Sequence, residues 1–170
     1  WQSSVQVDPA RLILVPDDVP EDVAARAYIN PLAALLMLET WPPAGRRVLL
    51  TGGGSLCARW LGTWALAEGA REVVAVHRSP GHAASLIGLG FRPVLQNDIA
   101  STVIARRCDL VFDAVGGTVG DAILHEMARG DFVSYGLLSG KPFGWRADGV
   151  HIHRFHLRDR LEGAADPAWR

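Results

Sequence analysis

Short, mostly apolar runs alternate with longer stretches in which apolar residues recur at helical spacing. The apolar runs lie at 47–51, 73–76, 91–95, 110–112 and 132–135. Runs with so few polar positions are typical of strands buried on both faces of a parallel sheet. After the first run, Leu56, Trp60 and Trp64 share one helix face, and Gly69 is placed to end that helix. The pattern therefore predicts strands and helices in alternation.

The expected helices begin at Pro20 and cover 32–39, 56–69, 83–89, 99–107 and 119–128. Two further strands are expected near the ends of the chain, at 4–15 and at 150–157. Strands that alternate with helices through right-handed crossovers build a doubly wound sheet. We therefore expect an α/β fold of the Rossmann type, with a mostly parallel sheet and three layers in the order α/β/α.

Composition excludes several classes of protein. The 170 residues suit one domain and are 49% hydrophobic and 21% charged, which is enough apolar material for a core. The formal net charge of -1 offers no basic face to a nucleic acid. The longest apolar stretch, 31–38, is far shorter than the ~20 residues of a membrane span. Cys57 and Cys108 are too few for a disulfide framework, so we expect free thiols in the cytoplasm.

The turn after the first buried strand carries three consecutive glycines, Gly52, Gly53 and Gly54. In a doubly wound fold, glycines at this turn let backbone N–H groups approach a pyrophosphate at the N-terminus of the next helix. The alternative is a turn that binds no ligand. Larger residues follow Gly54, and a side chain at a position with positive φ costs about 1–2 kcal/mol. We therefore expect Leu56 and Ala58 to weaken cofactor binding.

The end of the second strand indicates which cofactor is bound. Sites specific for NAD place Asp or Glu there to bind the ribose 2′-OH, whereas here His77, Arg78 and Ser79 follow Val76. A guanidinium suits a 2′-phosphate, so Arg78 predicts NADP(H); otherwise Arg78 is a solvated surface residue. The missing acid also counts against S-adenosylmethionine, which other proteins bind at a similar glycine turn.

Five segments together resemble the medium-chain dehydrogenase/reductase superfamily. They are NPLAA at 30–34, VLLTG at 48–52, HR at 77–78, DLVFDAVGG at 109–117 and VSYG at 133–136. Within the superfamily, the chain is most similar to the zinc-independent quinone oxidoreductases and the 2-enoyl thioester reductases. The resemblance implies an N-terminal GroES-like catalytic domain, then a nucleotide-binding domain, then a C-terminal return to the first domain.

By this resemblance, residues 1–19 are the tail of a missing catalytic domain, 20–144 are the NADP-binding Rossmann domain, and 145–170 are the truncated start of the return segment. The chain begins at Trp1 rather than at a methionine, so we expect further sequence upstream. The family's catalytic tyrosine would lie there. We therefore expect no catalytic residue in this chain and no turnover by the chain alone. Relatives commonly pair through the sheet edge near the C-terminus, which leaves a homodimer open.

The resemblance also implies which residues contact NADP(H). They are Asn30, Gly52, Gly53, Gly54, Ser55, Leu56, Cys57, His77, Arg78, Ser79, Val115, Tyr135, Gly136, Leu137, Leu138, Phe155, His156 and Leu157. This chain departs from the family pattern in three places. Leu56 and Ala58 stand where the family has glycines, Ala33 stands where it has a threonine, and His156 stands where the reductases have a tryptophan.

Other residues admit more than one interpretation. His151 and His153 share a strand face and His156 is near, but no cysteine or paired carboxylate completes a set, so no metal is expected. Cys57 at a helix N-terminus could be a nucleophile, but no base lies beside it in the sequence. Asp113 either orients a ribose or caps its own turn.

The sequence thus predicts the cofactor-binding part of a reductase that uses NADPH to reduce an activated C=C bond in an enoyl thioester, an enone or a quinone. The cofactor carries the chemistry, and the protein positions the nicotinamide near Val115 and residues 135–138. The alternative is a degenerate or isolated Rossmann module that binds nucleotide without catalysis of its own. The expected partner is a small-molecule substrate, with no nucleic acid and no membrane.

Overall fold

Six parallel strands form one sheet in the order β3-β2-β1-β4-β5-β6. The computed structural model describes residues 3–9, 12, 14–98, 104–144 and 148–161. The strands are β1 (Arg47–Leu50), β2 (Glu72–His77), β3 (Arg92–Leu95), β4 (Leu110–Asp113), β5 (Gly130–Ser134) and β6 (Val150–Arg154). The order reverses beside β1, where the chain moves from one half of the sheet to the other. This topology confirms the predicted doubly wound α/β fold.

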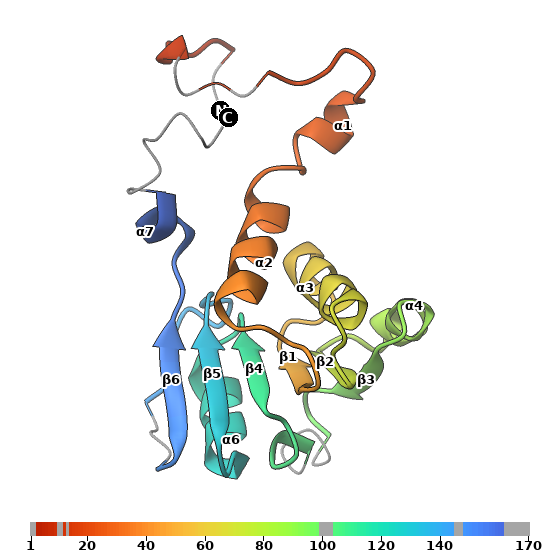
Figure 1. Ribbon diagram of the computed structural model, residues 1–170, viewed down its shortest axis with the longest axis vertical. Helices are drawn as coiled ribbons and strands as arrows, with labels where there is room; N and C mark the ends of the chain where they lie inside the picture. The colour runs from red at the N-terminus through yellow and green to blue at the C-terminus, as the bar shows by residue number, and fades with distance from the viewer. Residues whose placement is uncertain (1–2, 10–11, 13, 99–103, 145–147, 162–170) are drawn as a thin grey trace.

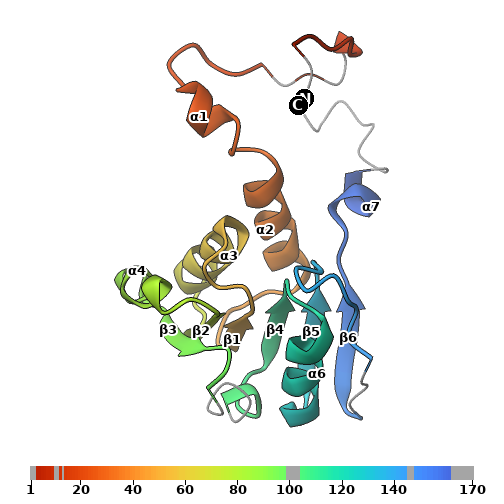
Figure 2. The same cartoon turned by 180° about the vertical axis from the view of Figure 1, so that it is seen from behind.

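Helices cover both faces of the sheet (Figures 1 and 2). They are α1 (Glu21–Ala24), α2 (Ile29–Thr40), α3 (Leu56–Ala67), the 3₁₀ turn η2 (Pro80–His82), α4 (Ala83–Gly88), α6 (Gly117–Glu126) and α7 (Leu157–Leu161). Figure 2 shows α6 in front of β4 and β5. Helices α2 and α3 pack against each other and belong to the apolar cluster of the opposite face. The segment that carries α1 extends away from the sheet, beyond the carboxyl ends of the strands.

Alternate residues of β1, β2, β4 and β5 pack into two separate apolar layers. On one face, Val48 and Leu50 pack with Leu61 of α3 and Leu86 of α4. On the other face, Leu49 packs in a second cluster that includes α6. Burying each such side chain contributes about 1.5–3 kcal/mol. These two layers hold the carboxyl ends of β1, β2, β4 and β5 at one edge, where the loops of the candidate site begin.

Two expectations about elements need correction, and a third lies mostly outside the described residues. The predicted strand at 4–15 is wrong: its described residues pair with no strand, and Val5 and Leu14 are 71% and 92% exposed. Its alternating pattern alone makes no strand, because a strand needs a neighbour to accept its hydrogen bonds. The last strand ends at Arg154, and Leu157 instead begins α7. Most of the helix predicted at 99–107 lies outside the described residues, although 104–105 are helical.

Among the described residues, no helix is long and apolar enough to cross a membrane.

Candidate cofactor-binding site

The three glycines lie between β1 and α3, at the carboxyl edge of the sheet. Gly52 adopts φ +60°, which favours glycine, and thereby turns the chain out of β1. The Gly53 amide donates to the Val76 carbonyl at 2.8 Å, and an added Cβ at Gly53 would lie 2.9 Å from the Cβ of Ala75. The loop is therefore held tightly against β2, and its glycines are required for that approach.

The first turn of α3 presents backbone donors to the space beyond the loop. The Ser55 hydroxyl caps the helix by accepting from the Ala58 amide at 3.2 Å. The amides of Leu56 and Cys57 donate to no backbone carbonyl in the part of the chain that the structure describes. Free N–H groups at a helix N-terminus, with the positive end of the helix dipole, favour an anion there.

The backbone strain expected at Leu56 and Ala58 is wrong, whereas weaker cofactor binding stays a prediction. No residue other than glycine among those described has a positive φ, so neither side chain strains the backbone. Both belong to α3 itself, and the left-handed position of the loop falls on Gly52. Ala58 is fully buried against the core, while Leu56 is 36% exposed and belongs to neither core cluster. The replaced glycines therefore do not distort the loop.

A buried carboxylate fixes the neighbouring loop. Asp113 ends β4, and its Oδ1 accepts from the Thr51 hydroxyl at 2.6 Å and from the Val115 amide at 3.1 Å, while Oδ2 accepts from the Gly116 amide at 2.9 Å. Thr51 Oγ1 in turn accepts from the Ala114 amide. Burial raises the pKa of Asp113, and the hydrogen bond from Thr51 opposes that rise. With both oxygens engaged, Asp113 caps its own turn, the second of its two predicted roles.

Tyr135 places an unsatisfied hydroxyl beside the start of α3. Its oxygen is buried and makes no well-aligned hydrogen bond within the described ranges, although the Cys57 and Ser55 side chains lie within hydrogen-bonding reach. Burial raises the pKa of Tyr135 well above its usual value, and the neighbouring Cys57 and Ser55 also act on that pKa. A buried polar atom without a partner is uncommon in a folded protein and is explained when a ligand supplies the partner.

Cys57 is a structural thiol rather than a nucleophile. Its Sγ contacts the Asn30 carbonyl at 3.8 Å, which joins the first turn of α2 to the first turn of α3. Burial raises the pKa of the Cys57 thiol to about 11. A thiolate is needed for attack, so this thiol is unreactive near neutral pH.

At the end of β2, the side chain of His77 is buried, whereas that of the following residue, Arg78, is exposed. His77 is buried, and its Nδ1 lies 2.8 Å from the Ser79 carbonyl. Arg78 is exposed and has no hydrogen bond or ion pair with any described residue. The structure thus leaves the guanidinium without a protein partner, and its predicted contact with a phosphate stays a prediction.

The other predicted contact residues lie at the same edge. Leu138 reaches back to Gly52, where its Cδ1 would lie 3.3 Å from an added Cβ, and Val115 lies at 3.7 Å. Phe155 is buried and donates its amide to the Ser134 carbonyl, whereas His156 is exposed. Gly136 and Leu137 lie in the loop after β5, and Leu157 begins α7 after β6.

Sequence reasoning missed two features of the site. A cavity of about 170 Å³ lies between the ends of β2 and β3 and the first turns of α6. It is lined by Val76, Gln96, Asn97, Thr118, Val119, Ala122 and Ile123. The second feature is His82, whose ring packs on Gly54. Neither carries a sequence motif, because both depend on which loops the sheet order brings together.

The histidines of the last strand do not form a metal site. His153 Nε2 lies 2.9 Å and His151 Nδ1 3.7 Å from the same Asp131 oxygen, and His156 instead faces Asp159 at 3.6 Å. No group of three or more metal-ligating residues occurs within the described ranges.

A doubly wound parallel sheet, a glycine turn after β1 and a basic residue after β2 define the class of protein: one with a dinucleotide-type binding domain. Solved structures agree with this assignment. A protein of Bacillus thuringiensis, provisionally assigned as an NADPH:quinone reductase, matches with a TM-score of 0.80 and 26% identity over 95% of this chain and 53% of its own. The mycobacterial protein Rv1454c, solved with NADPH, matches with a TM-score of 0.74 and 26% identity over 85% of this chain and 49% of its own.

The enzyme Etr1p, solved with NADP and crotonyl-CoA, has the same fold: its TM-score is 0.72 and its identity 20%, over 85% of this chain and 46% of its own. The similarity to quinone and enoyl thioester reductases confirms the predicted resemblance to the medium-chain superfamily. This chain spans about half the length of each of these proteins. No family model and no curated protein sequence matches it.

Proposed function

We propose that the chain is the NADP(H)-binding part of a reductase that acts on an activated C=C bond in an enoyl thioester, an enone or a quinone. The observation that carries this proposal is the set of unpartnered donors at one edge of the sheet: the first amides of α3 and the Arg78 guanidinium. The solved structures support it, because two of them hold NADPH or NADP and one also holds crotonyl-CoA.

Each part of the dinucleotide has residues suited to hold it. The amides of Leu56 and Cys57 suit the pyrophosphate, and Arg78 suits the 2′-phosphate. The cavity between β2, β3 and α6 is smaller than the ~300 Å³ or more of a typical ligand pocket, so it suits a single ring system such as adenine. Val115 and the loop after β5 would position the nicotinamide.

When bound, the cofactor supplies the hydride, and the chain's residues bind and orient it. Asp113 and Thr51 keep the loops after β1 and β4 in fixed relation, so the two loops are positioned before the ligand arrives. This preorganisation lowers the entropic cost of binding.

Calorimetric titration with NADPH and NADH tests the proposal. We expect the wild-type chain to bind NADPH more tightly than NADH. Arg78→Ala should weaken NADPH binding about tenfold and leave NADH binding nearly unchanged, because a charge-assisted hydrogen bond contributes roughly 1.5–3 kcal/mol. Arg129→Ala removes an exposed arginine beside the amino end of β5 and should change neither affinity.

The same titration separates the proposal from its alternative. Absence of binding up to millimolar NADPH would contradict it and favour a Rossmann module that has lost its ligand. Equal affinity for NADPH and NADH would contradict the role of Arg78.

A further inference from the structure

The side chain of His82 packs directly on the glycine loop. A Cβ built on Gly54 would lie 2.6 Å from both Cδ2 and Nε2 of His82 and 2.9 Å from Cε1. The imidazole edge that carries Nε2 therefore faces the loop. Gly54 does not have a positive φ, so its backbone alone does not require glycine. The absence of a side chain at Gly54 is explained by the approach of this ring.

The backbone around His82 holds the ring in this position. The 3₁₀ turn η2 begins with Pro80, and the His82 amide donates to the Ser79 carbonyl at 3.2 Å. The His82 carbonyl accepts from the Ser85 hydroxyl at 2.9 Å, and that hydroxyl also accepts from Arg59 of α3. The segment after β2 is thus tied to α3 through Ser85 and Arg59.

The imidazole itself has no partner. His82 is partly buried, and neither ring nitrogen makes a hydrogen bond or an ion pair with a described residue. Arg78, in the same loop, is also unpartnered. Two nitrogen donors without partners thus follow β2, at the position where a doubly wound fold binds the adenosine ribose, and one of them lies on the glycine loop.

We propose that His82 is a second determinant of cofactor specificity, donating from Nε2 to the 2′-phosphate of NADP(H) beside Arg78. This inference rests on the proposed NADP(H) binding and adds a residue that no sequence motif marks. An imidazole donor and a guanidinium on the same phosphate would favour NADP(H) over NAD(H), because only the former carries that group.

Titration with 2′,5′-ADP and 5′-AMP tests this role, because the two probes differ only in the 2′-phosphate. His82→Ala should weaken 2′,5′-ADP binding about tenfold and change 5′-AMP binding less than about twofold. His82→Lys should retain the preference for 2′,5′-ADP, since it restores a donor. His125→Ala, which removes an exposed imidazole from α6, is the matched control and should change neither affinity. Unfolding curves check that each variant is folded.

A double-mutant cycle adds an independent readout. Gly54→Ala should displace the ring and lower 2′,5′-ADP affinity in the wild-type background, but have much less effect in the His82→Ala background. Additive effects would contradict the proposed contact.

Three results of the titration would overturn the inference. Equal losses for both probes would place His82 on a group that they share, and unchanged affinities would exclude a contact. A gain on His82→Ala would mean that the ring obstructs the loop. If the wild-type chain does not prefer 2′,5′-ADP over 5′-AMP, both the proposed NADP(H) binding and the role of His82 are contradicted. If Arg78→Ala removes the preference and His82→Ala does not, only this inference fails.

Discussion

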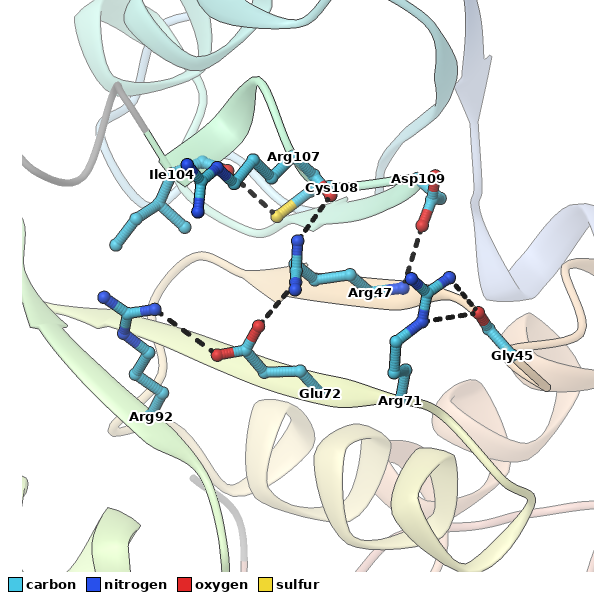
Figure 3. A network of polar contacts seen from close by, with 9 residues as sticks. All are labelled: Gly45, Arg47, Arg71, Glu72, Arg92, Ile104, Arg107, Cys108 and Asp109. Atoms are coloured by element: carbon cyan, nitrogen blue, oxygen red, sulfur yellow. Dashed lines mark hydrogen bonds and ion pairs between the residues drawn. The ribbon is translucent and has the colours of Figure 1, made fainter.

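The two edges of the sheet differ in whether their polar side chains have partners. At the amino edge, charged side chains at the starts of the strands are paired (Figure 3). Glu72 lies 2.5 Å from Arg47 Nε and 3.4 Å from Arg92, and Asp109 accepts from the Arg47 amide at 3.0 Å. The Arg71 guanidinium donates to the Gly45 carbonyl at 2.7 Å. These contacts join β1, β2 and β3 with the loop before β4.

At the carboxyl edge, donors are left without partners. Arg78 and His82 make no hydrogen bond to any described residue, and the buried Tyr135 hydroxyl lies beside the Cys57 and Ser55 side chains without a well-aligned hydrogen bond. Both edges belong to the same strands, so the difference does not come from the fold. Unsatisfied polar groups destabilise a protein unless something else binds them. We therefore propose that the amino edge serves stability and the carboxyl edge serves a ligand.

Asp113 is the exception at the carboxyl edge, and its removal is expected to have the largest effect. Asp113→Ala leaves the Thr51 hydroxyl and the amides of Val115 and Gly116 without their acceptor in a buried site. We expect a loss of about 3 kcal/mol in the free energy of unfolding, measured by urea denaturation at pH 7. Nucleotide binding should also be lost, because the two loops are no longer held together. A loss below about 1 kcal/mol would contradict this role.

The pH dependence of Asp113 has a defined sign. Burial raises its pKa in the folded state, so the folded state binds the proton more tightly than the unfolded chain does. This residue's contribution to stability is therefore greatest in acid, and it decreases as the pH rises above about 3.9, the unfolded value. Asp113→Asn should remove this dependence.

The sheet could be predicted from the sequence because its strands are apolar on both faces and leave a local signal. The run at 110–112 became β4, and every one of its residues is buried. The failures come from contacts that no local pattern contains. Residues 4–15 alternate like a strand in sequence, but the described ones among them pair with no strand. Leu56 was expected to strain the loop because the position of the positive φ could not be assigned before the turn was seen.

The same reasoning applies to the candidate site. Arg78 follows a predictable strand, so its position at the carboxyl edge could be predicted. His82 reaches the site only because η2 folds back over Gly54, a contact between two separate strand-to-helix connections. The roles of the predicted cofactor-binding residues stay predictions until nucleotide binding is measured.

The second-largest effect is expected at the amino edge, where Glu72→Ala should lower stability without affecting nucleotide binding. Its carboxylate pairs with two arginines, and the side chains of Glu72 and Arg47 are only 26% and 27% exposed. The Nε–H of Arg47 is not aligned with an acceptor, so the contact between Arg47 Nε and Glu72 is an ion pair without a hydrogen bond. Leaving Arg47 half-buried and unpaired should cost about 2 kcal/mol. Thermal or urea unfolding measures this loss, and calorimetry checks the binding.

Glu68→Ala is the matched control, because Glu68 is exposed at the end of α3 and has no partner among the described residues. It should change the unfolding free energy by less than about 0.5 kcal/mol. If Glu72→Ala weakens NADPH binding without lowering stability, the amino edge does not serve stability alone and the proposed difference between the two edges is contradicted.

The smallest effect concerns Asp131, which extends the paired edge to β6. Arg46 Nη1 and His153 Nε2 each lie 2.9 Å from one of its oxygens. Burial alone would raise the pKa of Asp131, but the hydrogen bonds from His153 and Arg46 outweigh it, so the pKa is lowered. The unfolded chain then binds the proton more tightly than the folded one. The stabilisation is therefore present above about pH 3.9 and is lost as the pH falls through the folded-state pKa.

Asp131→Asn should accordingly lower the unfolding free energy by about 1 kcal/mol at pH 7, since these partly exposed contacts are screened by solvent. The difference from the wild type should shrink as the pH falls below about 3.9. Urea denaturation of both proteins over this range measures it. This pH dependence of stability is opposite in sign to that of Asp113. The contributions of the amino edge and the carboxyl edge to stability can therefore be measured separately. A difference that persists unchanged in acid would show that Asp131 acts through packing rather than charge.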